Sequence, residues 1–412
     1  ANVVQNSAQE GSRPFEGQNA YANAVQSPVN IPFTELRDYN SPFHDFGGYY
    51  GSYTSNPYYI LNEFINEGRI DNFLGTFSTT LNIIDGLDLT ARIGTNVGDR
   101  TIREATAQFA YADHYVWADN LVASTRGGRA NSPGFFSQTE GTNSNLDVTG
   151  LLNYRRALDR SGDLLLNVTL GYNNFTRTTR SVTGSTVGGI IVPEFYNLAN
   201  SVQAPLASQS SSKYRIIGGF ANAQIGYQYR LFLEYSARND WSSTLPAENN
   251  SFFYQSVGVS SVVTDFFENR NENIDYVKFR ASIGTTGKDA QLYALQSTFI
   301  GNPIFQPLAN GRDLTFPLYG LAGCTRGYSI GNPDLMPELT TTFEIGVDAT
   351  LFKDRVDLAY SYYNSRLTNQ LVEVSLPNSS GFTRTVRNLG EISNQGHELS
   401  LTIRPIKGLV KG

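Results

Sequence analysis

Four side chains in one stretch of the sequence have the chemistry to hold a ligand: Tyr111, His114, Tyr115 and Trp117. Tyrosine and tryptophan rings stack on sugars and on other planar ligands, and neighbouring polar groups then set the ligand's orientation. The same rings could instead pack this segment against its neighbours or against a partner protein, which is the interpretation that we favour. These four residues are the ligand-binding candidates of the sequence.

The sequence contains no arrangement that predicts catalysis. Its three histidines, His44, His114 and His397, lie far apart and outside any catalytic motif. Residues 184–188 place a serine one position too early for a nucleophile elbow, and no phosphate-binding loop or zinc-protease motif is present. Residues 266–275 offer oxygen ligands but lack the spacing and the central glycine of a calcium loop. We therefore expect no enzymatic activity, no bound metal and no cofactor.

The composition narrows the class of protein. Charged residues make up 17% of the chain, where about a quarter is typical of soluble proteins, and aromatic residues make up 12%. The net charge of -6 and the scattered arginines give no electrostatic case for nucleic-acid binding. The single cysteine, Cys324, excludes an internal disulfide. No stretch approaches the roughly 18 uninterrupted apolar residues of a membrane helix.

Alternation of apolar and polar residues runs along most of the chain. Between Phe343 and Leu351, apolar residues occupy every second position, and the positions between them hold glutamate, glycine, aspartate and threonine. The chain contains about eleven such runs of roughly ten residues, the length that a tilted strand needs to cross a bilayer. The predicted strands are 72–83, 87–97, 147–158, 163–174, 214–226, 229–238, 252–263, 275–286, 340–352, 355–366 and 394–404.

Short and long links alternate between these strands. Outer-membrane barrels keep tight turns on the periplasmic side and long loops outside the cell. We therefore expect 72–404 to form barrel strands, 1–71 to be an extracellular loop region with a short helix at Tyr58–Asn66, and 405–412 to be a periplasmic turn. The links expected outside the cell are 98–146, 175–213, 239–251, 287–339 and 367–393.

The two faces of the predicted strands favour an all-β fold that is part of a large antiparallel transmembrane β-barrel. One face is aliphatic and aromatic, which suits lipid, and the other is polar and rich in glycine, which suits a wet or plugged lumen. A soluble sandwich or propeller also alternates, but propeller strands are about half this length. About eleven strands would leave two open edges in lipid, so we expect further strands outside this sequence. A total of about 22 would form a plugged transporter barrel, and roughly 16 to 18 would form a porin.

Three motifs carry a family resemblance. The first is an Asn-Pro-Asp-Leu stretch, followed by a glutamate and a threonine-rich strand; the second is Asn-x-Gly-x-x-x-Asn-x-Gly-x-Glu; the third is Arg-x-Asp-x-Ser-Ser. They resemble the SusC/RagA family of TonB-dependent outer-membrane proteins of Bacteroidetes, and the resemblance covers 210–404 well, 1–100 loosely and 101–210 hardly at all. The matching positions are Arg238, Asp240, Asn332, Pro333, Glu338, Asn388, Gly390, Asn394, Gly396 and Glu398.

We expect these motif residues to be structural. Gly390 and Gly396 would supply tight backbone positions at strand ends. Arg238 and Asp240 would fix a loop through an ion pair or a hydrogen-bonded clamp, in preference to contacting a substrate.

The resemblance also implies a function, which is TonB-dependent active import of a nutrient, a glycan or an oligopeptide, across the bacterial outer membrane. It implies a SusD-like surface lipoprotein as partner, TonB acting through an N-terminal part outside this sequence, and contact with outer-membrane lipid and lipopolysaccharide. It allows a dimer of transporter–lipoprotein pairs. Two alternatives stay open: a non-transporting interaction protein, such as an adhesin or a barrel subunit of a secretion machine, and a passive porin.

Overall fold

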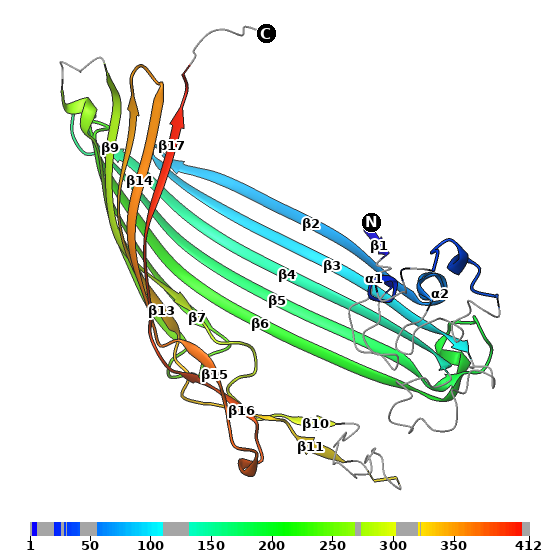
Figure 1. Ribbon diagram of the computed structural model, residues 1–412. Helices are drawn as coiled ribbons and strands as arrows, with labels where there is room; N and C mark the ends of the chain where they lie inside the picture. The colour runs from blue at the N-terminus through cyan, green and yellow to red at the C-terminus, as the bar shows by residue number, and fades with distance from the viewer. Residues whose placement is uncertain are drawn as a thin grey trace. The chain divides into compact units, whose positions relative to one another are not determined.

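The structure is a computed structural model, and its regular elements are mostly strands (Figure 1). It describes residues 2–5, 20–25, 29, 31–41, 56–109, 132–267, 273–301, 320, 321 and 323–405. The strands are β1 (Asn2–Gln5), β2 (Ile65–Ile84), β3 (Leu87–Phe109), β4 (Ser132–Ala157), β5 (Leu164–Ile190), β6 (Ser201–Tyr227), β7 (Leu231–Ser242), β8 (Ser251–Val262), β9 (Ile274–Lys288), β10 (Phe299–Gly301), β11 (Cys324–Arg326), β12 (Ser329–Ile330), β13 (Glu338–Leu351), β14 (Val356–Thr368), β15 (Leu371–Ser375), β16 (Arg384–Asn388) and β17 (Ile392–Ile403). The helices are α1 (Ala20–Val25) and α2 (Pro57–Glu63), with short 3-10 turns at Glu35–Arg37, Leu198–Asn200, Val263–Phe266 and Asn378–Ser380.

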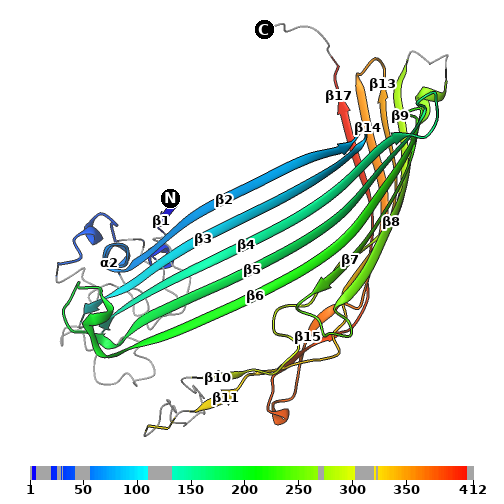
Figure 2. The same cartoon turned by 180° about the vertical axis from the view of Figure 1, so that it is seen from behind.

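Twelve strands form one antiparallel sheet in the order β1-β2-β3-β4-β5-β6-β7-β8-β9-β13-β14-β17. Apart from the short β1, these are the eleven strands that the sequence predicts, and each lies beside its neighbour in sequence, as both views show (Figures 1 and 2). Two small sheets, β10-β11 and β12-β16-β15, occupy links that were expected to be loops. None of the described helices is long and apolar enough to cross a membrane.

The predicted strand ends need correction in the first half of the chain. Strand β2 begins at Ile65, inside the expected loop region 1–71, and β3 to β6 extend far into the expected loops 98–146 and 175–213. The extensions are richer in Ser, Thr, Gln and Gly than the predicted strands and have few large apolar residues, so the alternation of apolar with polar residues is weak there. Cross-strand hydrogen bonds hold them instead, including Thr101 to Glu140 at 2.6 Å, Thr139 to Thr183 at 2.8 Å and Ser181 to Ser210 at 2.8 Å.

The expected helix at Tyr58–Asn66 is present as α2, displaced towards the N-terminus. Pro57 occupies the first turn, and the side chain of Asn56 accepts a hydrogen bond from the Tyr58 N–H at 2.9 Å. The helix ends at Glu63 because the chain then enters the extended backbone of β2.

The chain contacts divide it into two units: Ala1–Gly75 with Thr95–Asn145 and Arg177–Lys213, and Thr76–Gly94 with Leu146–Thr176 and Tyr214–Gly412. The second unit contains a buried apolar cluster formed by Leu245, Phe252, Ala290, Leu335 and Val386. Its members come from β8, β16 and the links between strands. The cluster packs these links onto the end of the sheet.

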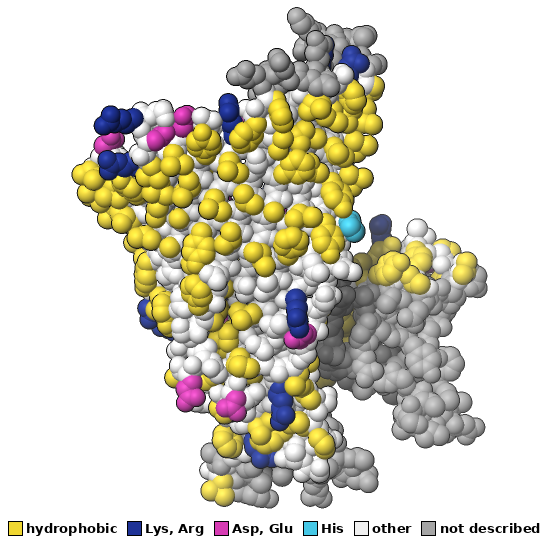
Figure 3. All heavy atoms as spheres, turned by 90° about the vertical axis from the view of Figure 1, so that its left-hand side faces the viewer, with side chains coloured by type: hydrophobic (Ala, Val, Ile, Leu, Met, Phe, Trp, Pro, Cys, Tyr) yellow, Lys and Arg dark blue, Asp and Glu magenta, His cyan; other side chains and the backbone are white. Residues whose placement is uncertain are grey.

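The predicted apolar face of the strands is exposed in the structure. Hydrophobic side chains gather over the face shown in Figure 3. Large apolar side chains that alternate along the strands are exposed, from 42% at Ile345 to 52% at Phe279 and 68% at Leu399. A soluble protein rarely leaves so many large apolar side chains exposed in one continuous patch, so this face requires an apolar environment.

Candidate functional site

The face opposite the apolar one is polar along β7, β8, β9 and β13, and the strand register aligns its side chains into rows across the sheet. One row runs through Ser236, Ser256, Gly284 and Thr342. The next runs through Glu234, Gly258, Ser282 and Glu344. Hydroxyl groups and carboxylates therefore lie side by side on neighbouring strands.

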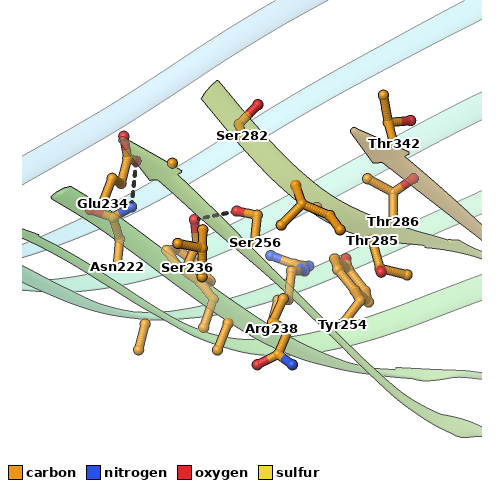
Figure 4. Close-up of a pocket in the computed structure, with 18 of the residues that line it drawn as sticks. Asn222, Glu234, Ser236, Arg238, Tyr254, Ser256, Ser282, Thr285, Thr286 and Thr342 are labelled. Atoms are coloured by element: carbon orange, nitrogen blue, oxygen red, sulfur yellow. Dashed lines mark hydrogen bonds between the residues drawn. The ribbon is translucent and has the colours of Figure 1, made fainter. Parts of the chain in front are cut away.

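A hollow of about 640 Å³ lies over these rows, and Figure 4 shows the side chains that surround it. Glu234 accepts a hydrogen bond from the Asn222 amide at 2.8 Å, and the hydroxyls of Ser236 and Ser256 are hydrogen-bonded at 3.0 Å. These groups have spare donor and acceptor capacity, so the hollow can exchange hydrogen bonds with a polar solute.

Arg238 closes the end of the hollow nearest to the link between β7 and β8. Its guanidinium forms an ion pair with Asp240 at 2.7 Å, and Tyr254 on β8 donates a hydrogen bond to the same carboxylate at 2.6 Å. The guanidinium also lies 5.4 Å from the centre of the Phe220 ring. At Gly218, an added Cβ would lie 2.3 Å from the guanidinium, so glycine leaves the room that the ion pair occupies.

A second arginine crosses the same face further along the sheet. Arg280 of β9 forms ion pairs with Glu344 at 2.5 Å and with Asp348 at 3.6 Å, both on β13. The side chain lies over Gly346, where an added Cβ would approach its Nε to 2.7 Å. These charges are paired across strands, so they stiffen the wall and leave no isolated charge that would attract one ligand.

Two of the motifs meet in the links of the second unit. The Asn332 amide donates to the Val386 carbonyl at 3.0 Å. The Asn388 amide accepts from the Met336 N–H at 2.9 Å and donates to the Met336 carbonyl at 2.8 Å. The link before β13 is therefore fastened to β16 by side-chain amides that take the place of strand pairing.

Glu338 provides the third fastening. It is 6% exposed, accepts a hydrogen bond from the Leu371 N–H at 2.6 Å and forms an ion pair with Lys288 at 3.1 Å. Pro333, the other motif residue in this link, directly follows Asn332 and carries no N–H. All these contacts join one segment of the chain to another, which is a structural role.

Comparison with known proteins identifies the fold. The family model described as "TonB dependent receptor-like, beta-barrel" matches residues 14–409. The chain belongs to this family. TonB-dependent receptor P26 of Formosa agariphila is 23% identical over 393 residues, which are 94% of this chain and 36% of the relative. TonB-dependent receptor P3 of the same organism is 21% identical, over 86% of this chain and 33% of the relative.

Solved structures give the same result for the fold of this TonB-dependent receptor barrel. The RagAB peptide importer in its closed-closed state matches with a TM-score of 0.68 and 20% identity, over 86% of this chain and 36% of that chain. The RagAB peptide transporter matches with a TM-score of 0.67 and 21% identity. The SusC/RagA resemblance is confirmed, and the chain spans about a third of the length of the relatives that it matches.

Membership in the TonB-dependent receptor family places the protein in the outer membrane and assigns its two faces. In a membrane barrel the apolar face contacts lipid, and the polar face lines the lumen. The rows over β7, β8, β9 and β13 are thus lumenal, and Arg238 and Arg280 lie on the lumenal wall of this receptor barrel.

The remaining motif residues lie on or beside β17. Gly390 adopts a left-handed backbone with φ +91°, and Gly396 faces Tyr363, whose hydroxyl would lie 2.6 Å from an added Cβ. Asn394 and Glu398 lie opposite Ser365 and Ser361 on β14. The structure thus places every motif residue in a turn, a strand or a link clamp of the receptor barrel.

The loop aromatics of the sequence prediction are not placed. Tyr111, His114, Tyr115 and Trp117 lie outside the described residues, so their role stays a prediction. Within the part of the chain that the structure describes, no group of three or more histidine, cysteine, aspartate or glutamate side chains could hold a metal ion.

The sequence did not predict one cluster of polar side chains, which surrounds Asp289. The carboxylate of Asp289 accepts hydrogen bonds from Ser242, from Thr244 at 3.0 Å and from Tyr214 at 2.9 Å. The serine pair of the Arg-x-Asp-x-Ser-Ser motif was the available signal, because Ser242 is its first serine. Asp289 lies 47 positions further along the chain, and no local pattern connects the two residues.

Proposed function

We propose that the chain forms part of the wall of an active importer that carries a polar nutrient, a glycan or an oligopeptide, across the outer membrane. The observation that carries this proposal is the lumenal face over β7, β8, β9 and β13, where aligned hydroxyls and carboxylates surround a hollow of about 640 Å³. Such groups exchange hydrogen bonds with a hydrated polar solute as it passes.

We assign energy coupling by TonB, and association with a SusD-like surface lipoprotein, to the whole protein. Family membership supports TonB coupling, and the similarity to the RagAB peptide importer supports a lipoprotein partner. In this proposal the long links, with their clamps at Asn332, Glu338 and Asn388, face outward from the cell, and the short turns face the periplasm, as in other outer-membrane barrels.

Gene deletion followed by growth on defined carbon and nitrogen sources tests import. Deletion should abolish growth on either one glycan class or an oligopeptide mixture, and the intact gene should restore it. Ser282→Trp, which projects a large ring into the lumenal hollow, should slow uptake of that nutrient. Leu233→Trp, on the lipid face and outside the lining of the hollow, is the matched control and should not.

Purification from outer membranes in mild detergent tests the partner. A stoichiometric surface lipoprotein should accompany the full-length protein. Unchanged growth on every nutrient, together with altered adhesion or secretion after deletion, would overturn the import proposal and favour a non-transporting interaction protein.

A further inference from the structure

We propose that the lipid face of β8, β9, β13 and β14 holds one acyl chain of an outer-leaflet lipid in a preformed groove. A hollow of about 400 Å³ lies on this face. Ala281 forms its floor, and the walls include Val259, Phe279, Ile345 and Tyr360. A bound lipid at this place is separate from the nutrient path on the lumenal face.

The groove arises from a size difference between neighbours in register. Ala281 lies opposite Val259 on one side and Ile345 on the other, so a small side chain stands between two large ones. Phe279 and Ile345 are 52% and 42% exposed and project beyond the alanine. A depression of this kind in an apolar surface gains dispersion contacts only when hydrocarbon fills it.

One wall of the groove is held in place before any lipid binds. The Tyr360 hydroxyl is hydrogen-bonded to Nδ1 of His397 on β17 at 2.8 Å, and the two rings stack with centroids 6.1 Å apart. The His397 ring also contacts Tyr362, with centroids 5.0 Å apart. A wall that is already fixed loses little side-chain entropy when a chain binds, and this favours one ordered chain over passing contact.

The polar boundary of the lipid face lies one short step away. Beyond Ala281 the outward positions of β9 are Ile283 and then Thr285, whose hydroxyl is bonded to Thr341 at 3.0 Å. Thr341 lies opposite Arg366, which forms an ion pair with Glu391. The boundary is thus four residues from the groove, about 14 Å along an extended strand.

This distance identifies the occupant as an acyl chain whose head group lies at the boundary. The lining of the groove is mainly apolar, with the Ser261 hydroxyl beside Phe279, and the groove belongs to an outer-membrane protein, so hydrocarbon is the medium that meets it. The boundary lies on the side of the long links. The choice of the outer leaflet therefore rests on the proposed orientation of those links.

Native mass spectrometry of the full-length protein in mild detergent tests the groove. The wild-type protein should retain one lipid of outer-leaflet type that Ala281→Leu loses, with occupancy at least several-fold lower, because the leucine fills the floor. Ala349→Leu, an outward position on β13 outside the groove, is the matched control and should retain it. Tyr360→Phe keeps the ring but removes the bond to His397, and should lower the occupancy without filling the groove.

Three outcomes would overturn the proposal. Equal retention by the wild-type protein and Ala281→Leu would show that no groove lipid exists. A second copy of the protein, lost on Ala281→Leu in place of a lipid, would identify the face as an interface between barrels. A retained inner-leaflet phospholipid would contradict the leaflet assignment, whereas nutrient growth after gene deletion tests import separately.

Discussion

Asp240 accepts hydrogen bonds from Arg238 Nε through both of its carboxylate oxygens, at 2.8 and 3.0 Å. The Asp240 side chain is only 5% exposed, while the Arg238 side chain is 28% exposed. Tyr254 adds a third donor to the carboxylate from the neighbouring strand. One carboxylate therefore joins β7 to β8.

Asp240→Ala should lower the free energy of unfolding by about 1.5–3 kcal/mol, because charged hydrogen bonds are lost and a guanidinium loses its partner. The urea midpoint of the full-length protein in detergent measures this change. Glu391→Gln removes the exposed ion pair with Arg366 and is the matched control, expected to cost less than about 1 kcal/mol. Equal effects of the two substitutions would contradict a structural role for the Arg238–Asp240 pair.

Two substitutions of Glu338 separate the contribution of its hydrogen bond to stability from that of its ion pair. Glu338→Gln keeps an acceptor for the Leu371 N–H and loses only the ion pair with Lys288, which is 77% exposed, so its cost should stay below about 1 kcal/mol. Glu338→Ala leaves a partly buried N–H unsatisfied and should cost about 1–3 kcal/mol. It should also speed proteolytic cleavage between β14 and β17. Glu373→Ala, in an exposed pair with Arg384, should leave the cleavage rate unchanged.

The sequence predicts the strands where lipid and lumen impose opposite chemistry on the two faces. Val257, Val259, Ile283 and Phe343 alternate with small polar residues, and all four are exposed on one face. The parts of β3 to β6 that extend into 98–146 and 175–213 were not predicted, because hydrogen bonds between polar side chains of neighbouring strands, such as Thr139 with Thr183, require no apolar face.

The candidate site was predictable only where its partners are close in sequence. Arg238 and Asp240 are two residues apart on one strand, so their pairing follows from the motif itself. The Asn388 contact with Met336 spans 52 positions and depends on how two long links fold against each other. The lumenal rows likewise require the register between strands, which no single segment specifies.

Gly396 is required because Tyr363 occupies the space above it. An added Cβ would lie 2.6 Å from the tyrosine hydroxyl and 2.9 Å from a ring carbon. Gly396→Ala should therefore cost about 1–3 kcal/mol through overpacking, read as a lower folded fraction on heat-modified gel migration. Gly150→Ala, where nothing lies within 4 Å, should be neutral. In the Tyr363→Ala background, Gly396→Ala should add little further cost; a cost that persists there would point to a backbone requirement at Gly396.

Asp159 should make the turn before β5 sensitive to acid. The Ser161 hydroxyl and the Leu164 N–H donate hydrogen bonds to its carboxylate and lower its pKa from the usual value of 3.8. Because the folded pKa is depressed, the stabilisation is present above the unfolded pKa and is lost as the pH falls through the folded pKa. Asp159→Asn should therefore be less stable than wild type at pH 6, and the difference should shrink below pH 3.8. Urea midpoints across this range measure it, and a difference independent of pH would contradict the mechanism.

Leu233 and Ser236 lie on opposite faces of β7, three positions apart, and test which face meets lipid. Leu233 is 48% exposed on the apolar face, whereas Ser236 belongs to the lumenal row. Leu233→Arg should make folding into lipid vesicles less favourable by about 2–4 kcal/mol, because a guanidinium in the hydrocarbon region loses its hydration. Ser236→Arg adds the same charge to a hydrated wall, where Glu234 is a neighbour, and should leave folding nearly unchanged while altering uptake. If Ser236→Arg blocked folding and Leu233→Arg were tolerated, the assignment of the two faces to lipid and lumen would have to be reversed, because burial of a guanidinium is strongly unfavourable only in lipid.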